Sequence, residues 1–164
     1  MQAASVRMPV QKTTGIPFVA ISDAPVLYLQ NWRISPPYAT RPDPNQALAD
    51  NDMNTWNWGQ PPFLEIAVED SDARANHFHL FRTNFIQDKK LSSGKARLLF
   101  SRINGKAEIW MNGKLLGSKT SLGTGDLSVD LPAGEGPAQL TVLVEAEPGK
   151  KAGLERNIIA EPKK

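Results

Sequence analysis

The sequence contains no cysteine, no long apolar run and no marked excess of charge of either sign. Without cysteine, disulfide bonds and thiolate metal sites are excluded, although this absence does not fix the cellular compartment. No apolar stretch approaches the length of a membrane span, and the first residues lack the apolar centre of a signal peptide. The 19 lysines and arginines and 17 acidic residues are spread along the chain. We therefore expect neither nucleic acid nor a membrane as a partner.

What the chain does have is enough apolar material for one sizeable core, since 40% of its 164 residues are hydrophobic. Residues 1–25 contain Pro9, Pro17 and Pro25, and proline is tolerated in edge strands but not in central ones. We expect this segment to be an extended lead-in with at most one edge strand. Residues 26–164 are expected to form a single domain.

The clearest local signal lies in residues 94–117. Asn104-Gly105 and Asn112-Gly113 are each flanked by apolar residues. Asn-Gly favours a type I′ turn, because both residues tolerate a positive φ. Apolar and polar residues alternate on either side of the first pair, so one side of each strand faces a core. The pattern predicts a β-meander of successive antiparallel strands.

Similar alternation predicts further strands along the chain. Residues 76–86 are apolar on both faces and are expected to lie centrally in a sheet, while residues 26–35 place Tyr28 and Trp32 on one face. The remaining expected strands are 63–69, 126–131, 139–146 and 157–160. Short strands separated by turn signals, without a convincing helix, indicate an all-β fold, an antiparallel β-sandwich.

Residues 36–62 form a long polar segment, and loops of such length are usually functional or disordered. Trp56 and Trp58 argue against disorder and point the same way in an extended chain, close to Asp52 and Asn54. Indole faces pack on the C–H patches of sugar rings, and polar side chains bind hydroxyls, so these residues are carbohydrate-binding candidates. The alternative is that the tryptophans pin the segment onto the sandwich or onto a neighbouring domain.

A weaker carbohydrate-binding candidate is Trp110. Alternation places its side chain on the face of its strand opposite to that of Ile109. On that face the long segment 36–62 either covers the indole or leaves it exposed in a groove.

Metal binding has less support in the sequence. Asp50, Asp52 and Asn54 place oxygen ligands at alternate positions, but the residues that follow break the EF-hand pattern. Such side chains more often bond to nearby backbone amides. We expect no cofactor, with a looser structural calcium site at these residues as the alternative. His77 and His79 alternate along a strand without a third ligand nearby, which favours packed or hydrogen-bonded histidines over a metal site.

No catalytic constellation is recognisable in the sequence. A nucleophile elbow and a phosphate-binding glycine loop are both missing. Glycosidase chemistry requires two positioned carboxylates, and sequence spacing does not show that any two converge. We therefore expect no catalytic residue in this chain.

Taken together, several segments resemble a known family. They are WRISPP, RPDPNQALADNDMNTWNWGQPP, FHLFRTNF, ARLLFSRINGKAEIWMNGKLLG and QLTVLVEAEPGKKAGL. In content and order they are similar to the accessory galactose-binding-like domain of bacterial β-galactosidases of glycoside hydrolase family 2. The DNDMNTW piece is the more specific part. The resemblance implies a jelly-roll β-sandwich beside a separate catalytic barrel, whose catalytic glutamates lie outside this chain.

The function that this resemblance implies is a non-catalytic one. The domain would bind or position a β-galactoside-type glycan, with the catalytic domain of the same parent chain as its partner. A purely structural brace between domains, without glycan affinity, is the alternative, and a small independent enzyme is a weaker one. The parent protein would be bacterial, and whether it is exported or periplasmic stays open.

Overall fold

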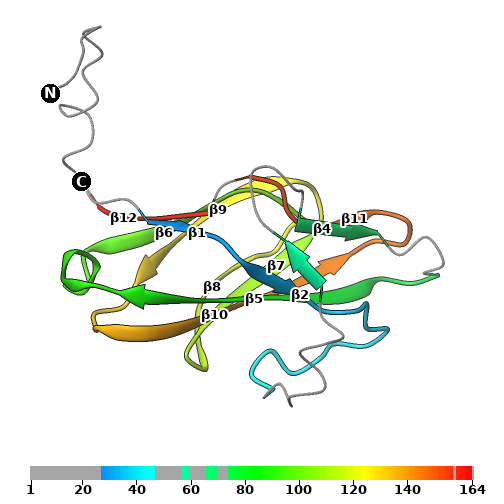
Figure 1. Ribbon diagram of the computed structural model, residues 1–164. Helices are drawn as coiled ribbons and strands as arrows, with labels where there is room; N and C mark the ends of the chain where they lie inside the picture. Colours follow the sequence, from blue (N-terminus) through cyan, green and yellow to red (C-terminus); the bar gives the residue numbers. More distant parts are fainter. Residues whose placement is uncertain (1–26, 47–56, 60–65, 70–73, 157, 164) are drawn as a thin grey trace, which may run out of the picture.

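The computed structural model describes residues 27–46, 57–59, 66–69, 74–156 and 158–163. In these residues the chain is almost entirely β, which confirms the predicted all-β antiparallel sandwich (Figure 1). The predicted lead-in at residues 1–25 lies outside the described part. The elements are β1 (Leu27–Leu29), β2 (Trp32–Ile34), β3 (Asn57–Gly59), β4 (Ile66–Glu69), β5 (His77–Gln87), the helical turn η1 (Lys89–Leu91), β6 (Ala96–Asn104), β7 (Lys106–Met111), β8 (Lys114–Lys119), β9 (Gly125–Leu131), β10 (Gly136–Ala146), β11 (Lys151–Leu154) and β12 (Ile158–Pro162).

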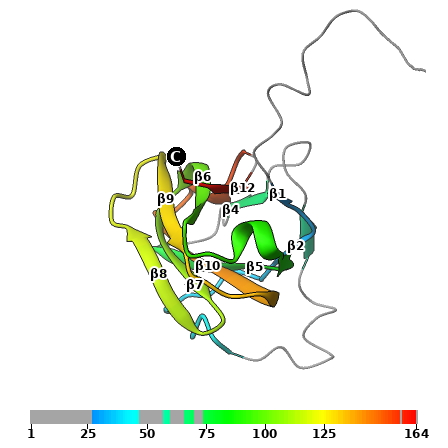
Figure 2. The same cartoon turned by 90° about the vertical axis from the view of Figure 1, so that its left-hand side faces the viewer.

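The strands form two layers, which Figure 2 shows one above the other. Among the described residues each layer is a six-stranded sheet. The first sheet has the order β1-β12-β6-β11-β4, with β9 also paired to β6. The second has the order β3-β2-β5-β10-β7-β8. The strand pairs are antiparallel, as expected for a jelly-roll-like sandwich.

The core lies between the two sheets and explains the alternation in the sequence. From the second sheet, Phe81, Ile109 and Val142 point inward and are fully buried. From the first sheet, Leu98 and Phe100 of β6 meet them with at most 1% of their surface exposed. Removal of this apolar surface from water is the main term that stabilises such a fold.

The predicted meander is only half right. Asn112 and Gly113, with φ of 49° and 85°, form the turn that joins β7 and β8. However, β6 pairs within the first sheet and β7 within the second, so Asn104-Gly105 carries the chain between sheets instead of closing a hairpin. Gly105 has a φ of 101°, and a Cβ there would collide with the carbonyl oxygen of Glu145. At this corner the chain bends sharply, and the close approach of the Glu145 backbone leaves no room for a side chain at Gly105.

The predicted strand at residues 26–35 is also divided. Asn31 has a φ of 62°, after which the chain leaves the first sheet (β1) and enters the second (β2). The bend changes the phase of the alternation, so Leu29 and Trp32 are both buried while Tyr28 is 52% exposed. The prediction that Tyr28 and Trp32 share one face is therefore wrong, because the left-handed backbone at Asn31 separates them.

Gly105 and Gly113 offer a matched test of this topology. Both have positive φ, but only at Gly105 does neighbouring backbone occupy the space of a side chain. We expect Gly113→Ala to lower the free energy of unfolding by about 1 kcal/mol. Gly105→Ala should lower it by about 3 kcal/mol or more, because strain and overpacking add. Urea denaturation of both variants measures the difference, and equal losses would contradict the sheet switch at Gly105.

Candidate functional site

The outer face of β7 carries Lys106, Glu108 and Trp110, which alternate with buried residues that face the core. Lys106 is exposed, whereas Glu108 and Trp110 are half-buried. The indole of Trp110 is therefore neither fully covered nor fully exposed. We call these three residues the β7 strip.

An ion pair fixes the middle of the β7 strip. Arg41 Nη2 lies 2.6 Å from Glu108 Oε1, and Trp110 Nε1 donates to the same oxygen at 3.0 Å. The Arg41 and Glu108 side chains are 48% and 31% exposed, so the pair contributes at most about 1 kcal/mol to stability. Its consequence is positional, because the carboxylate holds the polar edge of the indole and leaves the ring faces for packing.

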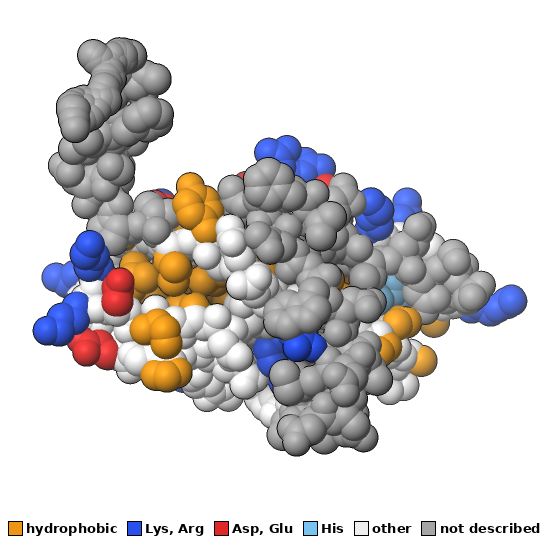
Figure 3. Space-filling model, viewed as in Figure 1, with side chains coloured by type: hydrophobic (Ala, Val, Ile, Leu, Met, Phe, Trp, Pro, Cys, Tyr) orange, Lys and Arg blue, Asp and Glu red, His pale blue; other side chains and the backbone are white. Residues whose placement is uncertain are grey.

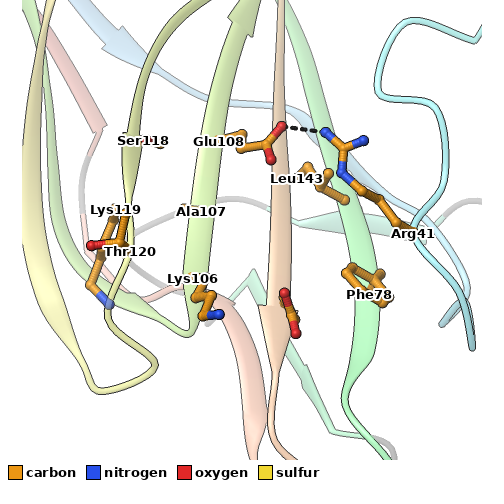
Figure 4. A pocket seen from close by; sticks show the side chains of 10 residues that line it. Arg41, Phe78, Lys106, Ala107, Glu108, Ser118, Lys119, Thr120 and Leu143 are labelled. Carbon is orange, nitrogen blue, oxygen red and sulfur yellow. Dashed lines mark hydrogen bonds and ion pairs between the residues drawn. The ribbon is translucent and has the colours of Figure 1, made fainter.

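A hollow of about 280 Å³ adjoins this ion pair. Phe78 and Leu143 contribute apolar surface to it, and Lys106 and Glu145, which are paired residues of β7 and β10, contribute opposite charges. Figure 4 shows Arg41, from the segment that follows β2, and Glu108 reaching toward each other with Leu143 between them. Charges of both signs thus surround this hollow.

A smaller hollow of about 120 Å³ adjoins Trp110. Its described lining residues are Asn45, Trp110, Asn112, Gly113, Gln139 and Thr141. None of these side chains carries a charge. Amide, hydroxyl and indole groups around an open hollow are the groups that commonly bind sugar hydroxyls and C–H faces.

Residues 36–46 cross the outer face of the second sheet and supply Arg41 and Asn45 to the two hollows (Figure 1). Tyr38 exchanges backbone hydrogen bonds with Phe78. The buried Arg82 of β5 donates to the carbonyl oxygens of Pro44 and Gln46, at 2.8 and 3.0 Å, and to Thr141 Oγ1 at 2.8 Å. Burial lowers the pKa of Arg82, but a guanidinium stays protonated at any physiological pH.

A third hollow, of about 360 Å³, lies where the turn after β6 meets the loop between β8 and β9. Beside it, Lys119 is buried and donates to the carbonyl oxygens of Gly105, Ser121 and Gly123. Burial lowers the pKa of Lys119, while these three carbonyl oxygens favour the ammonium form. An ammonium group has three N–H donors, and these three hydrogen bonds use all of them to hold the corner of the sandwich.

Most of the predicted site residues in segment 36–62 lie outside the described residues. These are Asp50, Asp52, Asn54 and Trp56. Trp58 lies in β3, where its backbone is paired with Arg33, and its side chain is not described. Part of the predicted loop is thus a strand, and both the carbohydrate-binding cluster and the calcium alternative stay predictions.

The two histidines form a packed pair, as the sequence favoured. His77 Nδ1 lies 2.7 Å from His79 Nε2, and His77 Nε2 lies 3.1 Å from the carbonyl oxygen of Glu147. Both side chains are at most 2% exposed, and the rings meet edge to face. Within the described ranges no group of three or more histidine or carboxylate side chains is placed to hold a metal ion. In the same ranges no helix has the length and apolar character needed to cross a bilayer.

Sequence analysis missed Arg41, Asn45 and Arg82. Arg41 and Asn45 are polar residues in a proline-rich segment, and nothing local indicates which strand they contact. The one available signal was Arg82, a lone arginine within the otherwise apolar run HFHLFRTNF. A charge at a predicted buried position requires polar partners, because an unpaired buried charge is too costly.

The sequence matches no protein-family model and no curated protein. The fold, however, is similar to that of solved bacterial β-glucuronidases. For the enzyme of an uncultured Clostridium sp. the TM-score is 0.61 at 15% identity, over 87% of this chain and 30% of that one. For the Ruminococcus gnavus enzyme in complex with D-glucuronic acid the values are 0.58 and 13%, over 85% and 29%. An FMN-binding β-glucuronidase from Facaelibacterium prausnitzii L2-6 gives 0.57 and 13%, over 84% and 22%.

These similarities establish a shared β-sandwich fold. This chain spans less than a third of the length of each of those structures. At 13–15% identity the likeness does not transfer substrate or activity. The neighbours are β-glucuronidases, so the β-galactosidase specificity in the sequence resemblance has no support from them.

Arg82 and Arg41 give a matched test of how the segment 36–46 is held. We expect Arg82→Met to lower the free energy of unfolding by about 2–4 kcal/mol, because three hydrogen bonds that the charged guanidinium donates are lost. Arg41→Met should lower it by at most about 1 kcal/mol, because its ion pair is exposed. Hydrogen exchange should then show lost protection of the Tyr38 amide in Arg82→Met alone. Equal protection in both variants would mean that Arg82 does not anchor the segment.

Proposed function

We propose that this chain is a non-catalytic domain that binds or positions a glycan within a larger protein of the glycoside hydrolase type. The observation that carries the proposal is Trp110, a half-buried indole held by Glu108 beside an uncharged polar hollow. Sugars present C–H faces and hydroxyl groups together, and this part of the surface offers a partner for each.

The solved structures of similar fold support the larger context. They are described as β-glucuronidases, and this chain corresponds to about 29% of the Ruminococcus gnavus enzyme. A domain of this size beside a separate catalytic domain is also what the sequence resemblance implies. The proposed partners are therefore the catalytic domain of the parent chain and a glycan, of which a β-galactoside is one candidate.

A structural brace is the second candidate, and one observation favours it. On the outer face of the first sheet, Tyr28, Ile159 and Leu99 stand side by side on β1, β12 and β6. Tyr28 is 52% exposed and the other two are partly exposed. Hydrophobic side chains also reach the surface between charged ones in Figure 3. Such a row suits contact with another domain.

Glycan binding at Trp110 can be tested by titration of the chain with galactose and short β-galactosides. We expect weak binding, in the millimolar to high micromolar range, corresponding to about 4–6 kcal/mol. Trp110→Ala should abolish this binding while the melting temperature stays close to that of the wild type. Tyr28→Ala removes an exposed aromatic residue from the opposite sheet and should leave binding unchanged. If no glycan binds, and if the catalytic domain of the parent chain associates with the wild type but not with Tyr28→Ala, the brace is the better description.

The absence of catalysis is a separate expectation. The chain should not hydrolyse aryl β-galactosides or aryl β-glucuronides, because the family that it resembles keeps its catalytic glutamates on another domain. Turnover that persists through purification and disappears on substitution of one acidic residue of this chain would overturn the proposal in favour of an independent enzyme.

A further inference from the structure

The hairpin of β7 and β8 contains a β-bulge next to Trp110. Ile109 pairs with Gly117, but the next pair is Trp110 with Leu115, so Leu116 is an extra residue on β8. Bulges are frequent at sheet edges and next to functional sites, where they redirect a side chain. In the described part of the second sheet, β8 is such an edge strand.

The Asn112-Gly113 turn decides which leucine lies beside the indole. Met111 pairs with Lys114 across this two-residue turn, so Trp110 pairs with Leu115, and the bulge begins only beyond that pair. Leu116 packs against the core, and Leu115 stands opposite Trp110 with 47% of its surface exposed. Directly paired residues share one face of a sheet, with Cβ atoms about 4.5–5.5 Å apart. Trp110 and Leu115 therefore form one apolar surface, which we call the Trp110–Leu115 platform.

The described side chains that line the hollow next to this platform are neutral. Asn112 Oδ1 accepts a hydrogen bond from the Gln139 amide at 2.8 Å, which fixes the turn against β10. Thr141 Oγ1 already accepts from Arg82 Nε, so its own proton is left to donate. The charged group that contacts the indole is the Glu108 carboxylate, which repels anions. Arg41 is paired with this carboxylate. Arg82 donates to Thr141 Oγ1 and to the carbonyl oxygens of Pro44 and Gln46, and neither arginine is among the described residues that line the hollow.

We propose that the Trp110–Leu115 platform and the adjoining hollow bind a single neutral pyranose unit and discriminate against uronic acids. The inference rests on the proposed function and specifies its ligand. The apolar face of the ring covers the indole and Leu115, and its edge enters the hollow of about 120 Å³. Hydroxyl groups there meet amide and hydroxyl side chains. A carboxylate in the same place meets no cation among the described residues that line the hollow, so its desolvation is poorly compensated.

The test is an NMR titration of the chain that follows the indole Nε1–H signal of Trp110. The probes are methyl β-D-galactopyranoside, methyl β-D-glucopyranoside and methyl β-D-glucuronide. The neutral glycosides should shift the signal, and the glucuronide should bind at least about tenfold more weakly, a difference of about 1.4 kcal/mol. Leu115→Ser should weaken the neutral glycosides about tenfold, whereas Ile86→Ser, at a residue that is 62% exposed and outside this hollow, should not.

A second variant tests the charge argument without disturbing the platform. Gln139 is exposed and lines the hollow, so Gln139→Lys should raise the affinity for the glucuronide relative to the galactoside. Glucuronide binding as tight as that of the neutral glycosides in the wild type would overturn the inference. Binding that ignores Leu115→Ser would overturn it as well while leaving the proposed function standing. If no glycoside shifts any signal, both the inference and the proposed function fail.

Discussion

The pairing of β5 with β10 is the interaction on which the other parts of the structure depend. The ladder runs without a break from His77–Ala146 to Gln87–Gly136. On its inner side, Phe81 and Val142 form the centre of the core. On its outer side, Leu80 and Leu143 are also buried, because the residues after β2 cover them. One pair of strands thus has two apolar faces, and the second of these requires the segment that completes the candidate site.

Local sequence patterns predicted the strands well but did not predict which strands pair. The apolar residues on both faces of β5 correctly indicated a central strand. By contrast, Asn104-Gly105 and Asn112-Gly113 look alike in sequence, yet only the second closes a hairpin. A positive φ is needed both for a tight turn and for a corner between sheets. What separates them is the set of partners of β6, which lie more than twenty residues further along the chain.

The candidate site was predictable to a similar extent. Alternation with Ile109 placed Trp110 on the outer face, and the structure confirms that placement. The presence of Arg41 and Asn45 at the site was not predictable. It depends on hydrogen bonds from Arg82 of β5 to the carbonyl oxygens of Pro44 and Gln46, which hold the segment in place. The position of Leu115 follows from the turn, since counting back from Asn112-Gly113 pairs Met111 with Lys114 and Trp110 with Leu115. The bulge at Leu116, beyond that pair, has no local signal in KLLG.

The difference between inward-facing and outward-facing residues allows proteins of one fold to differ in the ligands that they bind. Inward residues such as Phe100 and Ile109 are constrained by packing between the sheets. The residues that we propose to contact a ligand point outward and can change without loss of the core. The sheets can therefore be shared at 13–15% identity. In this chain the outer face of β7 has a charged part and an uncharged part. The charges of Arg41 and Glu108 neutralise each other at its middle, which leaves the end at Trp110 to be governed by apolar contact and neutral hydrogen-bonding groups. Those contacts are the basis of our proposal that the surface binds a neutral sugar.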